Sequence, residues 1–257
     1  MRPLWTGSLS FGLISIPVTM YSASKERSLD FAMLRKSDLC PISFKRVCKT
    51  SGEEVPYEDI VKGFEYREDK YVVLDEDDFK RASPEKSERI DIEAFVSEEE
   101  VNSKYYEKPY YLEPGKGADK AYVLLREALA QEKKVAVARM VFRQREDLVI
   151  VKPDENIILL NQLRYPDELR DHSDIKVPHK ADLSHKEIGM AIELIEKMTD
   201  RFNPKSYHDT YTEKLEEIIK AKARGKKFKP LPKEKNHKQT EPTDLVAQLR
   251  ASLEHHR

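Results

Sequence analysis

Apolar and polar positions alternate along residues 5–20, close to the start of the chain. Leu9, Phe11 and Leu13 are separated by small or polar residues, and from Ile14 onward the alternation continues with its parity shifted by one. A period of two predicts β-strands with one buried face, and a β-bulge produces a parity shift of one. Polar residues interrupt the run too often for a secretory signal or a membrane span. We therefore expect two half-buried strand segments of a folded domain.

Further short runs with strand character follow through the first two thirds of the chain. Turn-forming residues at 49–52 and 153–156 separate some of them, and the second turn predicts a β-hairpin. Many short strands at close spacing favour a barrel or a sandwich over a doubly wound sheet. The expected strands are 42–48, 70–74, 90–96, 105–111, 135–142, 147–152 and 157–163.

Three segments have the three-to-four residue spacing of amphipathic helices. The first covers residues 118–131. The second begins at Ser184, which forms a capping box with Glu187, and the third begins at Asn203 with Pro204 in the first helical position. The three apolar faces consist of Ala118, Tyr122, Leu125 and Leu129, then Ile188, Ile192, Ile195 and Met198, and finally Tyr207, Tyr211, Leu215 and Ile218. We expect the face of the second helix to be buried.

Composition and charge indicate a soluble protein with charged sectors. Of the 257 residues, 39% are hydrophobic and 36% charged, and this length suffices for one large or two modest domains. No segment is apolar enough to span a membrane, and two cysteines are too few for a disulfide framework, so a cytoplasmic protein is expected. The net charge of −1 conceals an excess of Lys and Arg in residues 1–52, 114–152 and 221–257, and of Asp and Glu in 53–113 and 153–220. A polyanionic partner would contact the basic sectors.

The last part of the chain has a different composition. Residues 222–238 carry eight Lys or Arg against one Glu and almost nothing apolar, which predicts a flexible basic tail. Thr243 and the following Asp could cap a short helix beyond it. Since that helix has nothing of its own to bury against, it is either a partner-binding peptide or a frayed terminus. Its apolar stripe is Leu245, Leu249 and Leu253.

Motifs typical of catalysis are missing from the sequence. The segment at 114–120 places a Gly-Lys pair before a helix, but Tyr110 and Gly117 stand where a P-loop needs Gly and Ser or Thr. Lys116 and Lys120, at the start of that helix, either contact a phosphate or are simply solvated. There is no HExxH spacing and no GxSxG motif. These absences favour a binding protein over an enzyme.

Neither cysteine has a partner at the spacing of a metal knuckle. Cys48 is followed by Ser51 where a C-x2-C motif would need its second cysteine, and Cys40 is too distant to replace it simply. We therefore expect no metal site and no cofactor, and the roles of the two cysteines stay open.

Several segments in order along the chain resemble the prokaryotic Ku family. They are WTGSLSFGLISIPV at 5–18, FKRVCKTSGEEVPYEDIVKGFEY at 44–66, YYLEPGKGADKAYVLLREAL at 110–129, LRYPDEL at 163–169 and FNPKSYHDTYTEKLEEIIKAK at 202–222. The last resembles the helix that follows the Ku core. The resemblance covers roughly residues 1–222, through several motifs rather than one.

The resemblance implies a mixed α/β fold, mainly β, with a Ku-type β-barrel core and bridging segments that form a homodimeric ring. In that family the ring threads onto the ends of broken double-stranded DNA and recruits ligase D in non-homologous end joining, with no catalytic residue required. It implies a core over 1–200, a C-terminal helical segment over 201–225 and a basic tail with a terminal helix over 226–257. The location would be cytoplasmic and nucleoid-associated. Related sequences often carry a C-x2-C where this chain has Cys48 and Ser51, so a metal or redox role there is not carried over.

The residues expected to bind DNA follow from the need to accept any break. Phosphate contacts carry no sequence information, whereas base-edge contacts do, so Lys and Arg along a surface should supply the affinity. Arg139, Arg143 and Arg145 share parity in an extended segment, which predicts that they project to one side. The full set is Lys25, Arg27, Arg35, Lys36, Lys45, Arg46, Lys116, Lys120, Arg139, Arg143 and Arg145.

The residues expected to bind protein partners lie in the C-terminal third. Tyr207 and Tyr211 are candidates for ligase recruitment or for packing of the C-terminal helix, and Leu245 and Leu249 for contact with a partner. The preferred dimer surface is formed by strands between about 135 and 165. Two other functions compete with this interpretation. A nuclease would need a metal-binding carboxylate cluster, and a protein-interaction scaffold would bind DNA only through its tail.

Overall fold

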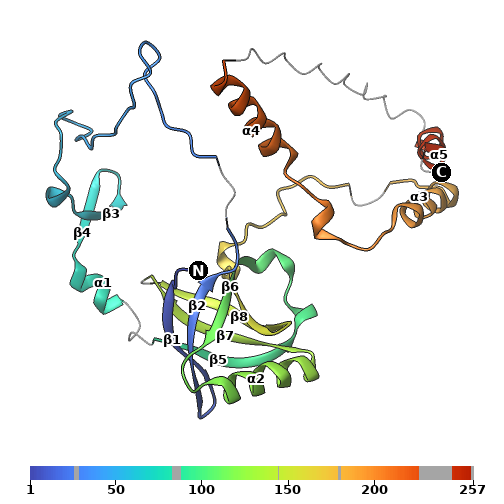
Figure 1. The fold of residues 1–257 in the computed structure, drawn as a ribbon, viewed down its shortest axis with the longest axis horizontal. Helices are drawn as coiled ribbons and strands as arrows, with labels where there is room; N and C mark the ends of the chain where they lie inside the picture. Colours follow the sequence, from blue (N-terminus) through green and yellow to red (C-terminus); the bar gives the residue numbers. More distant parts are fainter. Residues whose placement is uncertain (26–28, 83–87, 144, 179–180, 226–244, 256–257) are drawn as a thin grey trace. The chain divides into compact units, whose positions relative to one another are not determined.

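A computed structural model describes most of the chain (Figure 1). The described residues are 1–25, 29–82, 88–143, 145–178, 181–225 and 245–255. They form two compact units, Met1–Asp171 and His172–Arg257.

The first unit is built around a closed β-barrel. Its strands follow the order β1-β2-β6-β9-β8-β7-β5. Neighbouring strands are antiparallel except β1 and β5, whose parallel pairing closes the barrel. The prediction of a barrel in a mainly β fold is confirmed. The strands are β1 (Trp5–Phe11), β2 (Ile14–Ser22), β5 (Arg89–Ser97), β6 (Tyr106–Pro114), β7 (Lys134–Phe142), β8 (Arg145–Asp154) and β9 (Ile157–Leu163).

The parity shift near the N-terminus comes from a tight turn. Phe11 pairs with Ile14, so Gly12 and Leu13 form a two-residue hairpin loop between β1 and β2. Gly12 has a φ of 56°, a conformation that glycine adopts without steric cost at the first position of such a loop. The two strands are confirmed, but the prediction of a β-bulge is wrong. A two-residue loop shifts the apolar pattern as a bulge does.

Alternate residues of the barrel strands fill its interior together with one helix. The helix α2 (Asp119–Glu132) lies along one end of the barrel in Figure 1 and buries Tyr122, Leu125 and Leu129 in the same core. The predicted first helix and its apolar face are therefore confirmed. The most deeply buried barrel side chains are Leu9, Ile16, Val18, Met20, Ile90, Leu112, Val149, Val151, Ile158 and Leu160.

A long excursion, residues 23–88, separates β2 from β5. It contains β3 (Lys62–Arg67), β4 (Lys70–Leu74) and α1 (Glu76–Ala82), with β3 and β4 forming a two-stranded sheet. The prediction of β4 is confirmed. The predicted strand at 42–48 is wrong, because this stretch forms only one isolated bridge, between Val47 and Glu54, and is otherwise irregular.

The described residues of the second unit form three α-helices, α3 (His185–Met198), α4 (Thr210–Ala223) and α5 (Leu245–His255). The capping box at Ser184 and Glu187 is present at the start of α3. The third predicted helix begins later than expected. Asn203 caps only a short 3-10 turn, and Asp209 caps α4 through the backbone N–H of Thr212 at 3.0 Å. The chain also forms 3-10 turns at Tyr57–Asp59, Glu98–Glu100, Ser103–Tyr105, Pro166–Glu168 and Pro204–Ser206.

The apolar face predicted for α3 is not buried within the described chain. The side chains of Ile188, Ile192, Ile195 and Met198 are 44 to 65% exposed. The expectation that they are buried is therefore wrong for the isolated chain. The helical spacing identified an apolar face correctly, but it does not say whether the same molecule covers that face.

Candidate nucleic-acid interface

The predicted DNA-binding residues of the first basic sector lie in the excursion and fall into two groups. Lys25 and Lys36 are exposed and form no ion pair with another described residue. Arg35 and Lys45, in contrast, are ion-paired with carboxylates. Arg35 contacts Asp38 at 2.5 Å and Lys45 contacts Glu54 at 2.5 Å. Arg27 lies outside the described residues.

Arg46 lies beside an aromatic ring in the same segment. Its guanidinium carbon is 5.2 Å from the centre of the Tyr57 ring. The neighbouring Val47 and Glu54 form a β-bridge across a turn, which places Arg46 beside the base of that turn. Stacking on an aromatic face orders a guanidinium without occupying it in an ion pair, so Arg46 can still contact a phosphate.

The turn before α2 presents two lysines. Lys116 and Lys120 are exposed and make no ion pair within the described chain. The backbone N–H of Gly115 donates to the carbonyl of Pro17 at 2.7 Å, which anchors the turn to β2. Lys116 and Lys120 are therefore available for contacts with phosphates, in a turn that is hydrogen-bonded to the barrel.

The three arginines predicted to share one side do not do so. Arg139 is on β7, Arg145 is on β8, and the register pairs Phe142 with Arg145 across a hairpin. Since Arg139 and Phe142 are three positions apart on one strand, Arg139 and Arg145 belong to opposite faces. Arg143 is in the turn with a φ of 52° and stacks on Phe142. The parity argument failed because the segment reverses direction.

Arg139 and Arg145 are also held by carboxylates. Arg139 contacts Glu93 at 3.1 Å and Glu146 at 3.5 Å on the outer face of the barrel. Arg145 contacts Glu168 at 2.5 Å and Asp147 at 3.4 Å. A phosphate that bound either arginine would have to compete with these pairs.

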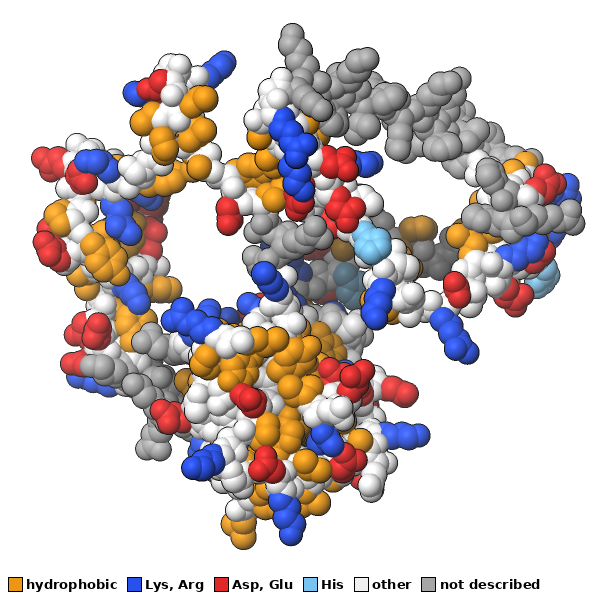
Figure 2. All heavy atoms as spheres, viewed as in Figure 1, with side chains coloured by type: hydrophobic (Ala, Val, Ile, Leu, Met, Phe, Trp, Pro, Cys, Tyr) orange, Lys and Arg blue, Asp and Glu red, His pale blue; other side chains and the backbone are white. Residues whose placement is uncertain are grey.

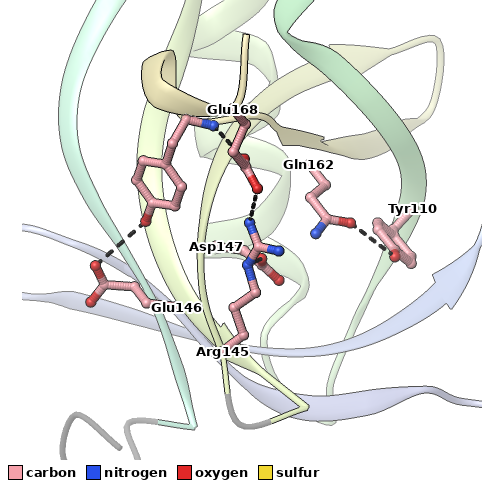
Figure 3. Close-up of polar contacts among 7 residues, drawn as sticks. Tyr110, Arg145, Glu146, Asp147, Gln162 and Glu168 are labelled. Carbon is pink, nitrogen blue, oxygen red and sulfur yellow. Dashed lines mark hydrogen bonds and ion pairs between the residues drawn. The ribbon is translucent and has the colours of Figure 1, made fainter. Parts of the chain in front are cut away.

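Figure 3 shows Arg145 within a polar network that joins β8 to the turn after β9. The backbone N–H of Tyr165 donates to Glu168 at 2.7 Å, and this bond, together with Arg145, lowers the pKa of Glu168. The hydrogen bond to Glu168 in turn raises the pKa of Arg145. Asp147 is only 4% exposed, and burial raises the pKa of its carboxyl. The network fixes the turn against the barrel, which is a structural task for Arg145.

Some exposed cations were missed by the sequence analysis. Lys62 on β3 lies 4.7 Å from the centre of the Phe79 ring, and Lys70 on β4 is exposed. They were not selected because residues 53–113 are acidic overall. The alternation of Phe64 and Tyr66 was the signal that could have placed Lys62 on a strand, whereas Lys70 already begins the predicted strand 70–74.

Cys48 lies at the base of the turn formed by residues 48–52. The backbone N–H of Gly52 donates to the carbonyl of Cys48 at 2.9 Å and closes the turn. Hydrogen bonds from Ser51, its backbone N–H first and its hydroxyl second, lower the pKa of the Cys48 thiol to about 7. Cys48 is half-buried, whereas Cys40 is exposed, and both are free thiols.

The described residues offer neither a cluster of metal ligands nor a membrane-spanning helix. No three His, Cys, Asp or Glu side chains among them lie close enough together to hold a metal ion. None of the described helices combines the length and the apolar character needed to cross a bilayer.

The excursion also exposes many apolar side chains. Phe44 is 80% exposed and Tyr57 is 77% exposed, and both faces of the β3–β4 sheet are open. Figure 2 shows hydrophobic side chains at the surface of this segment, interspersed with charged ones. Exposed apolar surface of this extent typically marks a protein interface. Further exposed apolar residues of the excursion are Phe31, Met33, Leu39, Ile42, Val61, Phe64, Tyr66, Tyr71 and Val73.

These features define a class of β-barrel protein in which a long, apolar and partly cationic excursion interrupts the barrel. A family model described as the Ku70/Ku80 beta-barrel domain matches residues 10–190. The chain is 43% identical over 256 residues to the non-homologous end joining protein Ku of Opitutus terrae, covering 98% of this chain and 91% of that protein. It is 36% identical over 256 residues to the protein of the same name from Bacillus subtilis, covering 99% and 82%. The chain belongs to the Ku family.

Proposed function

We propose that this protein binds the ends of double-stranded DNA breaks without sequence specificity, as a homodimeric ring, and recruits a DNA ligase of the ligase D type for non-homologous end joining. The observation that carries the proposal is the match of the chain, over nearly its whole length, to relatives named for that process. The barrel and its excursion support it on physical grounds. The protein would act by binding and positioning, without a cofactor.

Binding to DNA of any sequence requires positively charged side chains that contact phosphates and not base edges. Lys25, Lys36, Lys116 and Lys120 are exposed and unpaired among the described residues, so they can contact phosphates without breaking existing ion pairs. Each such contact releases counterions from DNA and adds affinity that falls with salt. Base-edge readout is not needed for this task.

A homodimer would explain the apolar surface of the excursion. Stable interfaces bury about 1,200–2,000 Å² in total, and they are rich in aromatic residues. The excursion exposes Phe31, Phe44, Tyr57 and Phe64, which are residues of that kind. Two copies related by a two-fold axis would each cover the excursion of the other. This proposal replaces the dimer surface at about 135–165 that was preferred from the sequence, because those strands already pair with their neighbours within the closed barrel. A closed aperture would then admit a DNA terminus but not the interior of a circle.

Ligase recruitment is assigned to the second unit. Tyr207 and Tyr211 are 71% and 74% exposed, and Phe202 lies 5.8 Å from Tyr207 between ring centres. Clustered exposed aromatic residues are typical of interface hot spots. We assign this cluster and the Leu245–Leu249 stripe of α5 to the partner, and we assign DNA to the first unit.

The decisive experiment compares a linear duplex with the same DNA as a covalently closed circle. A ring binds the linear form, and the sealed circle does not compete. Equal competition by the circle would refute threading. Analytical ultracentrifugation of the free protein should give a dimer, and a monomer would refute the ring.

A truncated variant distinguishes a DNA-binding ring from a scaffold that binds DNA only through its tail. A variant ending at residue 222 lacks the basic tail and α5. We expect it to keep its preference for ends with weaker overall affinity, since the tail adds only non-specific attraction. Complete loss of DNA binding would favour the scaffold, and metal-dependent cleavage of the linear duplex by the full chain would favour a nuclease.

A further inference from the structure

The C-terminal helix α5 does not stand alone in the second unit, because it packs against α3. Its apolar stripe is partly covered there. Val246, Leu249 and Leu253 are half-buried, whereas Leu245 at the start of the helix is 46% exposed. The prediction that this stripe has nothing of its own chain to bury against is therefore wrong.

The helix α3 carries two apolar stripes that differ in exposure. Met190, Ala191 and Leu194 are half-buried, whereas Ile188 and Ile192 on the neighbouring stripe are exposed. Residues 190 and 194 are four positions apart, as are 188 and 192, so each pair lies along one line of the helix surface. Since α5 packs on α3, the half-buried stripe is the one that faces α5.

The two helices contribute unequally to this contact. The capping box fixes the start of α3, where the Ser184 hydroxyl accepts from the Glu187 N–H at 3.2 Å and the Glu187 carboxylate accepts from the Ser184 N–H at 2.6 Å. The helix α5 has 11 residues, and isolated helices shorter than about 12–15 residues are marginal in water. Its helical structure therefore depends on a surface such as α3.

We propose that α5 is a removable cover that docks in cis on the Met190–Leu194 stripe of α3 and thereby hides its own partner-binding stripe. Any partner that uses Leu249 must first displace α5 from α3. Docking therefore reduces the apparent affinity for that partner to its intrinsic value multiplied by the fraction of molecules in which α5 is free. The identity of the partner as a ligase rests on the proposed function, whereas the docking of α5 on α3 does not.

Hydrogen exchange of residues 245–255 in the full-length protein tests the docking without any ligase. Leu194→Glu places a charge under α5, and we expect exchange of the α5 amides to accelerate about tenfold or more. The matched control is Ile192→Glu, the same change on the exposed stripe of the same helix, which should leave α5 protected. Exchange over residues 185–198 shows in both variants whether α3 itself is intact. If α5 exchanges equally in wild type and in Leu194→Glu with α3 intact, the docking is refuted.

A variant in α5 tests whether the effect of Leu194→Glu comes from the lost contact or from local unfolding of α3. Leu249→Glu leaves the α3 sequence untouched, and we expect it to release α5 to the same extent as Leu194→Glu. The double variant should add nothing, because both changes break one contact. Additive effects of the two changes would refute a shared contact.

Docking in cis is distinguished from an exchange of α5 between two copies by isotope mixing. A photo-crosslinking residue at position 249 is introduced into a mixture of light and heavy protein whose subunits have been exchanged. Docking in cis gives crosslinks to α3 only within light or within heavy chains. Mixed crosslinks would show that a second copy supplies α3 and would refute the cis cover.

The consequence for the partner is measured last, with purified ligase D. Leu194→Glu should bind the ligase several-fold more tightly than wild type, while Ile192→Glu should match wild type. Equal affinity of Leu194→Glu and wild type, with α5 released, would refute competition. Absence of ligase binding in every variant would refute the ligase assignment under the proposed function, and the exchange data would still decide whether α5 docks on α3.

Discussion

The backbone N–H of Ile158 donates a 2.6 Å hydrogen bond to the hydroxyl of Tyr122 in the buried interior of the barrel. The same hydroxyl donates to the carbonyl of Leu112 at 2.6 Å. Leu112 and Ile158 are opposite each other in the register of β6 and β9. One side chain of α2 therefore satisfies a backbone donor and a backbone acceptor of two neighbouring strands. Burial raises the pKa of this phenol, so it stays protonated and able to donate.

Replacing Tyr122 by Phe should destabilise the barrel without changing its shape. The change leaves a buried N–H and a buried carbonyl without their partner, which costs about 2–4 kcal/mol in the free energy of unfolding. Urea denaturation followed by circular dichroism measures the loss. Tyr21→Phe is the control, because the Tyr21 hydroxyl donates to Glu113 at the exposed surface, where water replaces the lost hydrogen bond, so the free energy of unfolding should hardly change. Equal costs for the two variants would contradict the role given to Tyr122.

The sequence predicted the parts of the fold that depend on local spacing. Tyr122, Leu125 and Leu129 recur at helical intervals, and all three are buried in the barrel core. The residues Ile188 and Ile192 recur in the same way but stay exposed in the chain. Periodicity identifies an apolar face, but the element that covers it depends on long-range or intermolecular packing that no local pattern contains.

Strand parity has a similar limit at turns. Around Gly12 a two-residue loop imitated a bulge, and between Arg139 and Arg145 a hairpin placed residues of equal parity on opposite faces. Neither loop was recognised, because a single glycine marks the first one and neither glycine nor proline marks the second. The prediction of the DNA-binding residues was less accurate than the prediction of the fold. Whether a lysine is free depends on ion pairs such as that between Lys45 and Glu54, which are nine positions apart and which no local pattern shows.

Two glycine substitutions should shift stability in opposite directions. A Cβ at Gly7 would lie 2.2 Å from the carbonyl oxygen of Glu88 and 2.4 Å from the Trp5 ring, so Gly7→Ala must displace backbone at the junction of β1 and β5. We expect a loss of about 2 kcal/mol or more. Gly189 lies inside α3 with open space around it, and Gly189→Ala should stabilise that helix by up to about 1 kcal/mol. Thermal unfolding measures both, and a stabilised Gly7→Ala variant would contradict the close approach.

Cys48 should react as a thiolate at neutral pH. Its pKa of about 7 means that the thiolate fraction rises through pH 7 and is nearly complete by about pH 8.5, where an ordinary thiol is only half ionised. The measurement is the rate of iodoacetamide alkylation between pH 6 and 9 in a Cys40→Ser background. Ser51→Ala removes the hydroxyl donor but keeps the backbone N–H, so the midpoint should rise and still stay below that of a free thiol. A midpoint near 8.5 in the parent would contradict the hydrogen bonding seen in the turn.

The lysines that are free in the structure should contribute more to DNA affinity than those held by carboxylates. Lys116 and Lys120 form no ion pair within the described chain, whereas Lys45 is paired with Glu54 at 2.5 Å. If Lys116 and Lys120 each contact one phosphate, each change to Ala should lower the slope of log K against log salt by about 0.9. Lys45→Ala should change the slope by less than half of that, because a phosphate must first displace Glu54.

Binding of a blunt duplex at several salt concentrations, measured by fluorescence anisotropy, provides these slopes. All three variants remove one positive charge, so net charge cannot account for a difference between them. The same loss of slope for Lys45→Ala as for Lys116→Ala would show that the ion pair to Glu54 opens freely. A loss confined to Lys45→Ala would place the DNA on the excursion and exclude the turn before α2 from the interface.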